Sequence, residues 1–433
     1  MPRLRLRDWA TLPLMLWLAL WLSINTGPWN IAGLGAGASA SVNALRACLP
    51  LFVLALAGLT LGVGRRRMPR GLVEYGFWFY GLVMTIAATG AGNWFGQAYW
   101  GLAFLASLAT VEKGLRSPDP LDFACRLNWL SWITTCLVLA TLLFLARDVL
   151  IDDSGSAYGA ITRYDPDGGL GMSRSTGLAR MAAVPAIIAL VFIVSRGGWQ
   201  RLAGIVVLAA ALAILWIMQA RGAVFAFAGA MAFVLSFGPR KLQKLGLASA
   251  GVVALMVFAG TRENGFVDFW MHITRDQGAE GFSTMSGRDV IFQNVLDRWA
   301  DAPLVGYGPQ ADRMFPDVGN AQNAVLYALL CAGLVGAAGF VAAIAAALFC
   351  LAKLNLDHRS VPLKDREMLM VTSGIVVFSV LRSIPENQAA VFSIDLLIQY
   401  PAMIYLAMLA AVSSRTRRRR PAKTRMKRAR RIR

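Results

Sequence analysis

Charged residues are scarce in this sequence of 433 residues: only 15% are Asp, Glu, Lys or Arg, whereas 57% are hydrophobic and the mean hydropathy is +0.55. A soluble domain carries about 25% charged and about 45 to 50% apolar residues. A chain of this length has too little charge to cover the surface of a soluble core. The composition therefore excludes a soluble globular protein and indicates an integral membrane protein.

Histidine and cysteine are also rare, with two and five residues respectively. The cysteines lie in predicted spans or on the predicted cytoplasmic side, without paired spacing in the outer loops: Cys48, Cys125, Cys136, Cys331 and Cys350. A disulfide framework and a zinc site are therefore not expected, and we predict no metal and no cofactor.

Apolar runs long enough to cross a bilayer recur along the whole chain. We predict twelve spans, at 9–26, 44–63, 72–90, 94–111, 127–147, 179–195, 202–218, 222–238, 245–260, 323–350, 368–383 and 390–412. The fold class is thus an all-α polytopic membrane protein with about twelve transmembrane helices and one large periplasmic loop between the ninth and tenth.

The net charge of +19 is unevenly distributed between the two predicted sides of the membrane. With twelve spans, the predicted cytoplasmic segments hold 31 of the 43 basic residues, including all seven Lys. This bias places both termini in the cytoplasm. The other twelve basic residues are all Arg: Arg46, Arg147, Arg163, Arg174, Arg180, Arg221, Arg262, Arg275, Arg288, Arg298, Arg313 and Arg382.

The chain divides into four regions: a bundle of nine spans (1–260), the large outer loop (261–322), three more spans (323–413) and a basic tail (414–433). Alone, the tail would suggest nucleic acid. At the end of a membrane protein it instead favours binding to anionic lipid headgroups, at about 1 kcal/mol per cation. We expect no nucleic-acid partner, and a disordered tail.

The large outer loop contains an amphipathic helix over Ser286–Ala300, with Ser286 as N-cap and Ile291, Val295 and Trp299 on one face. Such a helix lies along a membrane surface or over a cavity mouth. Arg288 falls in its first turn, where free N–H groups and the helix dipole favour an anion such as phosphate. The alternative is that Arg288 only pairs with a neighbouring carboxylate.

Several arginines lie near the outer ends of spans. Arg221 follows "QA" in a short turn, Arg174 and Arg180 flank the sixth span, and Arg382 closes the eleventh. A cation at this depth has a cost, which snorkelling to lipid headgroups could offset. Arg also suits pyrophosphate, because its planar fork donates two parallel hydrogen bonds. Codon bias is the competing explanation for the absence of Lys.

Three motifs follow in order: Arg221 in its outer turn, "SGRDVIFQNVLDRWADAPLVGYGP" (Ser286–Pro309) and "GNAQNAVLYALLCAGLVG" (Gly319–Gly336). With the topology, they resemble the O-antigen ligase and polymerase superfamily of bacterial envelope glycosyltransferases. The resemblance implies an inverting, metal-independent transferase whose donor is a glycan on undecaprenyl pyrophosphate. It assigns stabilisation of the leaving pyrophosphate to Arg221 and Arg288, with Arg174 as a further candidate.

We therefore expect catalytic roles for Arg221 and Arg288. Substrate binding is expected for five further residues: Arg174, Arg180, Gln322, Asn323 and Arg382.

The sequence departs from the ligases at one position. Where they carry a His-Asn pair before the tenth span, this chain has Gln322 and Asn323, and an amide cannot act as a general base. His272 could replace the His in space. The remaining possible bases are the carboxylates of Glu263, Glu280, Asp289 and Glu386.

Three functions stay open. The first is a polymerase of lipid-linked repeat units of an exopolysaccharide or lipopolysaccharide at the periplasmic face of the inner membrane. The second is a ligase that transfers the glycan to lipid A core or protein. The third is a lipid or polysaccharide transporter, which would usually show internal repeats and interrupted spans; the spans show no duplication.

Overall fold

The computed structural model describes residues 11–24, 36–62, 70–90, 94–145, 175–218, 220–236, 288–357 and 361–431. In these segments the chain forms α-helices and two short 3-10 helices. Their bounds are α2 (Leu12–Ser23), α3 (Ala36–Leu61), α4 (Leu72–Ala87), η2 (Ala88–Gly90), α5 (Trp94–Gly114), α6 (Pro120–Leu145), α9 (Ser175–Ser195), α10 (Trp199–Ile217), α11 (Arg221–Leu235), α15 (Arg288–Asp301), η3 (Ala311–Arg313), α16 (Ala324–Leu356), α17 (Leu363–Arg382) and α18 (Ile394–Arg431).

The expected all-α fold is confirmed for the described part of the chain. Seven of the described helices are long and apolar enough to cross a membrane, and two more apolar helices, α2 and α11, are shorter. Eleven of the predicted spans coincide with a helix, whereas the ninth, 245–260, lies outside the described residues. The total of twelve spans stays a prediction.

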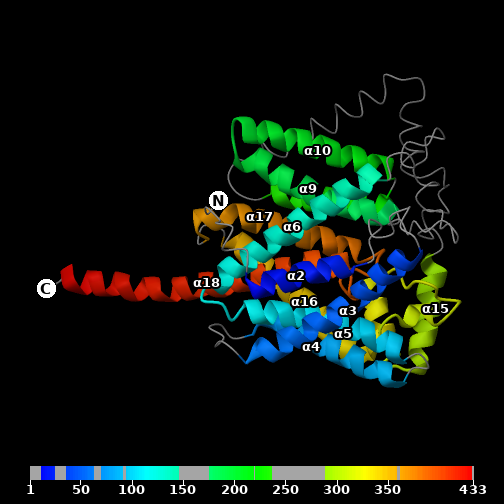
Figure 1. The fold of residues 1–433 in the computed structure, drawn as a ribbon. Coiled ribbons are helices and arrows are strands. Elements are labelled where there is room, and N and C mark those ends of the chain that lie inside the picture. The colour runs from blue at the N-terminus through cyan, green and yellow to red at the C-terminus, as the bar shows by residue number, and fades with distance from the viewer. Residues whose placement is uncertain are drawn as a thin grey trace, which may run out of the picture.

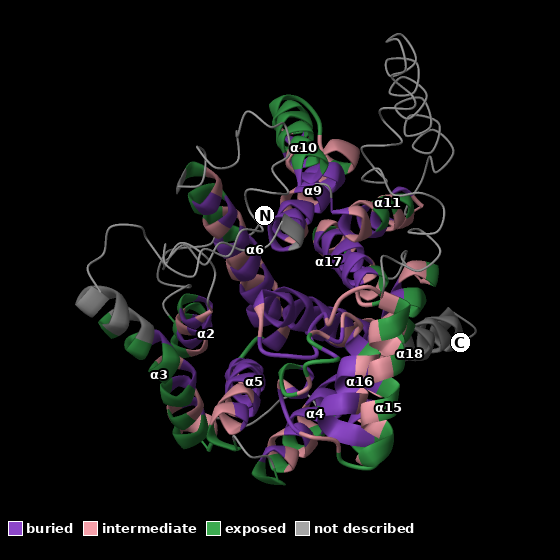
Figure 2. Cartoon of the chain, turned by 90° about the vertical axis from the view of Figure 1, so that its right-hand side faces the viewer, coloured by how far each residue is buried: buried purple, intermediate pink, exposed green. Residues whose placement is uncertain are grey.

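The long helices run side by side, and α15 lies across them at one end of the bundle (Figure 1). The closest packing joins α16 to α4, α10 to α9, α3 to α5 and α11 to α17. In the view along the bundle, buried residues gather toward its middle (Figure 2). The apolar side chains of α10 are mostly exposed, as expected for a helix that contacts lipid.

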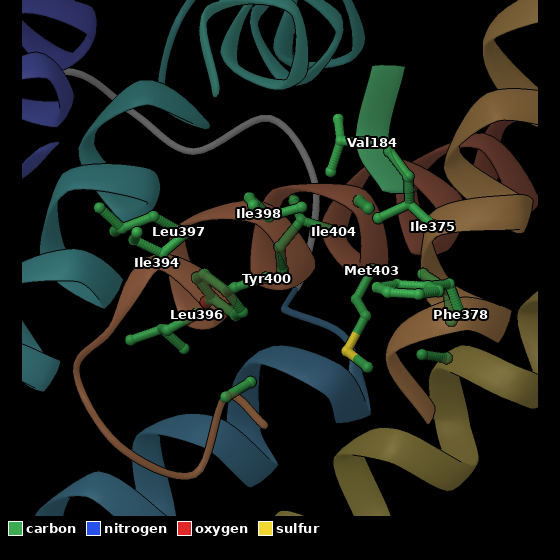
Figure 3. Packing of buried hydrophobic residues seen from close by; sticks show 14 of the residues in the cluster. Val184, Ile375, Phe378, Ile394, Leu396, Leu397, Ile398, Tyr400, Met403 and Ile404 are labelled. Carbon is green, nitrogen blue, oxygen red and sulfur yellow. The ribbon is translucent and has the colours of Figure 1, made fainter. Parts of the chain in front are cut away.

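The first half of α18 forms the centre of the core. Ile394, Leu397 and Tyr400 are buried together with Ile375 and Val184, which α17 and α9 contribute (Figure 3). Close packing of this kind, rather than a hydrophobic drive out of lipid, holds membrane helices together. It also positions the starts of α9 and α18 relative to the end of α17.

Some helices begin before the predicted spans. α6 begins at Pro120, seven residues before the predicted 127, because Asp119 caps it: its Oδ1 accepts a hydrogen bond from the N–H of Asp122 at 3.1 Å. α9 begins at Ser175, so Arg180 lies inside a helix rather than at its entry. Hydropathy finds the part of a helix in the membrane, whereas capping decides where the helix starts.

The expectation of a disordered basic tail is wrong: α18 continues as a helix to Arg431 (Figure 1). Twelve of the twenty residues of the tail are Arg or Lys, which favour helices. The buried part of α18 removes the cost of nucleation, so the helix propagates beyond the bundle.

Helix α16 is interrupted at Gly333, whose φ of 58° and ψ of −170° are not helical. Residues 303–308, here called the plug segment, lie against this break. Four backbone hydrogen bonds join them: Leu334 N–H to the Pro303 carbonyl (2.8 Å), Val335 N–H to Leu304 (3.1 Å), Tyr307 N–H to Leu330 (2.9 Å) and Gly308 N–H to Cys331 (2.8 Å). The plug segment thus satisfies backbone groups that an interrupted helix would leave unpaired in a membrane. The sequence did not predict this break.

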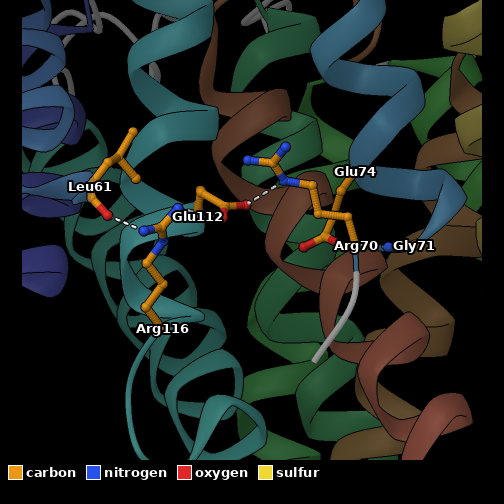
Figure 4. A network of polar contacts seen from close by, with 6 residues as sticks. All are labelled: Leu61, Arg70, Gly71, Glu74, Glu112 and Arg116. Carbon is orange, nitrogen blue, oxygen red and sulfur yellow. Dashed lines mark hydrogen bonds and ion pairs between the residues drawn. The ribbon is translucent and has the colours of Figure 1, made fainter. Parts of the chain in front are cut away.

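At the end opposite α15, basic side chains join the ends of neighbouring helices; we call this the basic end. The buried carboxylate of Glu112 lies 3.2 Å from Arg70 Nε and 3.5 Å from Arg116 Nη2 (Figure 4). Arg116 also donates to the Leu61 carbonyl, and Lys113 donates to the Thr60 carbonyl, both at the C-terminus of α3. These cations lie where the helix dipole favours them.

Candidate functional site

Helix α15 confirms the predicted amphipathic helix. It spans Arg288–Asp301, and Val295 is buried while Ile291 and Trp299 are half-buried on the same face. The predicted N-cap, Ser286, lies outside the described residues. α15 is fixed to the following loop at Asp317, whose carboxylate accepts a hydrogen bond from Arg298 Nε at 3.1 Å.

Arg288 is the first residue of α15, and its Nε donates a hydrogen bond to Gln322 Oε1 at 2.5 Å. The structure thus joins two residues that the sequence predicts for the site. Gln322 has a φ of 46°, in the left-handed region that residues with a Cβ rarely adopt. Such strain persists only where the surroundings impose it, and it is concentrated at functional sites.

Asn323 caps α16. Its Oδ1 accepts hydrogen bonds from the N–H groups of Val325 (2.9 Å) and Leu326 (3.0 Å), and its Nδ2 donates to the Ile384 carbonyl (2.9 Å). The Ala324 N–H also donates to the Ser383 carbonyl at 3.0 Å. The beginning of α16 is therefore fastened to the turn that follows α17. Substrate binding by Asn323 stays a prediction.

Arg382 closes α17 and is almost completely buried, with 2% of its side chain exposed. Its Nη2 lies 3.8 Å from Glu386 Oε1. With its amide oriented to satisfy both neighbours, Gln388 accepts a hydrogen bond from Arg382 Nη1 and donates one to Asp395 Oδ1, each 3.2 Å long. Asp395 also pairs with Arg180. One polar network therefore links α9, the end of α17, the following turn and the start of α18.

Arg221 is the first residue of α11. The next residue, Gly222, packs on Pro385, since a methyl group there would lie 3.2 Å from Pro385 Cγ. α11 therefore begins beside the turn that carries Glu386. Arg174, the remaining predicted arginine, lies outside the described residues.

Four of the predicted arginines thus lie at the α15 end: Arg180, Arg221, Arg288 and Arg382. Arg180 and Arg288 are near enough to Arg382 for their positive charges to act on it. Arg221 and Arg288 each occupy the first position of a helix, where the dipole disfavours a cation by about 0.3 to 1 kcal/mol. The same position favours an anion bound between the guanidinium and the free N–H groups.

The predicted candidate bases differ in how they are placed. Asp289 is exposed on α15, and Glu386 belongs to the polar network of Arg382. His272, Glu263 and Glu280 lie outside the described residues.

Asp312, which the sequence did not single out, is buried in η3, and burial raises the pKa of its carboxyl above the ordinary value. Its Oδ2 accepts a hydrogen bond from the Ala321 N–H at 3.3 Å. Asp312 therefore holds the backbone immediately before the strained Gln322.

Sequence reasoning also missed Gln388 and Asp395. Asp395 carried a usable signal, because a carboxylate inside a predicted span, here 390–412, requires a partner. Gln388 carried none, since its neighbours come from two other segments.

Within the described ranges, no group of three or more His, Cys, Asp or Glu side chains is placed to hold a metal ion. The polar side chains that the described site presents are instead guanidinium groups, amides and carboxylates. No model of a known protein family matches the chain, and no curated protein matches its sequence.

Proposed function

We propose that the chain is a bacterial inner-membrane glycosyltransferase that polymerises glycan repeat units carried on undecaprenyl pyrophosphate. The proposal rests on the resemblance to the O-antigen ligase and polymerase superfamily. The observation that carries it furthest is that α11 and α15 both begin with a predicted arginine, Arg221 and Arg288, at the end where Arg180 and Arg382 also lie.

The distribution of charge supports placing the α15 end in the periplasm. Lys113, Arg116, Arg196 and Lys353 all lie at the opposite end, in or just after the last turns of their helices. Cytoplasmic segments are enriched in Lys and Arg. On this orientation both termini are cytoplasmic, and a lipid-linked donor in the outer leaflet reaches the arginines from the side.

In the proposed reaction, an acceptor hydroxyl oxygen forms a bond to the anomeric carbon of the donor sugar, and the bond from that carbon to the pyrophosphate oxygen breaks. The electron pair goes to the diphosphate, which leaves as undecaprenyl pyrophosphate. Arg221 and Arg288 stabilise the charge that develops on this group. Guanidinium groups fixed in advance cost no reorganisation in the transition state.

Transport is the competing function from a different class, and the interruption of α16 is the feature it would use. Transporters bind substrates at interrupted helices whose backbone groups face a cavity. Here the Leu330 and Cys331 carbonyls at the break already accept hydrogen bonds from Tyr307 and Gly308. A break whose backbone groups are already paired favours a structural role, and hence the transferase.

Deleting the gene separates the two transferase functions. Loss of a polymerase leaves single repeat units, whereas loss of a ligase leaves full-length chains stranded on the carrier lipid. Loss of the surface glycan, with the lipid-linked donor held on the cytoplasmic side, would instead support transport.

Alanine substitutions test the arginines. Arg221→Ala and Arg288→Ala should each abolish transfer at an unchanged protein level in the membrane, and Lys at either position should rescue poorly, because an ammonium group cannot form the two parallel hydrogen bonds. Polymer of wild-type length in both alanine variants would remove these residues from the site.

A further inference from the structure

We propose that Glu386 is the general base of this transferase, in place of the histidine that Gln322 replaces. This inference rests on the proposed function. It is carried by the position of Glu386 between the segments that hold the predicted arginines.

The turn after α17 brings Glu386 to this position. Its neighbour Pro385 packs on Gly222, directly after Arg221. The carbonyl of Ile384, two residues before Glu386, accepts a hydrogen bond from Asn323, directly after the Gln322 that holds Arg288. The backbone that carries Glu386 is thereby fixed to both arginine-bearing segments.

The carboxylate of Glu386 is also available for proton transfer. Its side chain is 23% exposed, and the ion pair with Arg382 is 3.8 Å long, beyond hydrogen-bond distance. Lone pairs on both oxygens can therefore accept a proton. At this distance the guanidinium of Arg382 restricts the position of the Glu386 carboxylate without forming a hydrogen bond to its Oε1. A group that positions a general base should act in this way.

The other carboxylates at this end are less suitable. Asp395 is held by Arg180 and Gln388, and Asp312 is buried against the Ala321 N–H. Asp317 is bound to Arg298 on the solvent side of α15. Asp289 is exposed at the start of α15, and no hydrogen bond or ion pair to another described residue fixes its direction. Glu386 combines restraint by Arg382 with an exposed fraction of 23%, at the turn that contacts both arginine-bearing segments.

In the reaction, Glu386 accepts the proton of the acceptor hydroxyl as that oxygen attacks the anomeric carbon. The electron pair of the broken glycosyl bond leaves with undecaprenyl pyrophosphate, and the protonated Glu386 later releases its proton to water. No metal or redox partner is required, and charge and atoms balance.

The test uses the full-length protein in lipid nanodiscs, with lipid-linked glycan extracted from a strain that lacks the gene. Glu386→Gln should lower the transfer rate by about 10² to 10⁴, the usual contribution of a general base. Binding of undecaprenyl pyrophosphate should stay within about twofold, since the arginines are unchanged. Glu386→Asp should keep more activity than Glu386→Gln.

Chemical rescue separates a base from a structural carboxylate. Added formate should raise the rate of Glu386→Ala, because a small carboxylate can occupy the vacated space and take the proton. Asp317→Asn serves as the control for loss of a carboxylate at this end and should transfer at the wild-type rate.

Two failures can be told apart. If the wild-type protein neither binds undecaprenyl pyrophosphate nor transfers glycan, the proposed function fails and the role of Glu386 fails with it. If the wild type does both while Glu386→Gln transfers at the same rate, or formate leaves Glu386→Ala inactive, Glu386 alone is excluded.

Discussion

The two ends of the helix bundle both carry arginines, but they use them differently. At the basic end, Lys113 and Arg116 bind carbonyls at the C-terminus of α3, and Glu112 lies between Arg70 and Arg116. At the α15 end, Arg221 and Arg288 occupy the first positions of their helices. The helix dipole favours the first arrangement and opposes the second.

The difference separates charges that stabilise the fold from charges that serve another purpose. The cations of the basic end donate hydrogen bonds to carbonyls at the C-terminus of α3 and thereby hold neighbouring helix ends together. At the α15 end, the chain is held by backbone bonds of the plug segment, by the Asn323 cap and by the polar network that joins Arg180 and Arg382 to Asp395. Arg221 and Arg288 lie at helix starts, where an anion is favoured, and the proposed diphosphate is an anion of the required kind.

Disrupting the plug segment should have the largest effect on stability. Gly333→Ala requires a Cβ 2.2 Å from the Leu304 carbonyl carbon at a φ of +58°. Strain and overpacking together should lower the free energy of unfolding by about 3 kcal/mol. Gly319→Ala is the matched control: its φ is +59°, yet nothing lies within 4 Å of its Cβ, so about 1 kcal/mol is expected. Equal losses of thermal stability in detergent would show that the plug segment does not hold this end together.

At the basic end, removing the shared carboxylate should reduce stability and spare function. Glu112 is 2% exposed, but its partner Arg70 is 39% exposed. We therefore expect Glu112→Gln to cost only about 1 to 2 kcal/mol. Transfer per folded molecule should not change. Asp301→Asn, at an exposed carboxylate of α15, should leave the melting temperature within about 2 °C. A Glu112→Gln variant that melts like the wild type would mean that this ion pair contributes nothing.

At the α15 end, a stabilising change should instead reduce ligand binding. Gln322→Glu places a carboxylate on Arg288, and this carboxylate competes with a diphosphate. Affinity for undecaprenyl pyrophosphate should fall by about tenfold, or 1.4 kcal/mol, while thermal stability is kept. Gln310→Glu is the control, because Gln310 is also left-handed, with a φ of 61°. If both variants bind as tightly as the wild type, Arg288 does not contact the diphosphate.

The smallest effect is expected in the pH dependence of thermal stability. The hydrogen bond from Arg298 lowers the pKa of Asp317 below its ordinary value. The stabilisation is therefore present above about pH 4, the unfolded value, and is lost as the pH falls through the lower folded pKa. The melting temperature of the wild type should exceed that of Arg298→Gln slightly at pH 6, and the gap should close toward pH 3. A gap that widens in acid would contradict this sign.

The amino-acid sequence was sufficient for the all-helical architecture and for the positions of Arg221 and Arg288 at helix starts. Hydropathy marked Arg221 as unusual, and amphipathicity placed Arg288 at the start of a helix. The interruption at Gly333 was not predictable, because glycine is common in membrane helices and the cause lies in the plug segment. Gln388 and Glu386 take their positions from partners on other helices, which local patterns do not reveal.

The most direct measurement is the affinity of the purified protein, in nanodiscs, for undecaprenyl pyrophosphate without a sugar. The wild type and Arg116→Ala should bind equally, because Arg116 belongs to the basic end. Arg288→Ala should bind at least about tenfold more weakly, the loss expected for a charge-assisted contact to phosphate. Equal affinity of Arg288→Ala and Arg116→Ala would contradict the assignment of the α15 end as the diphosphate site.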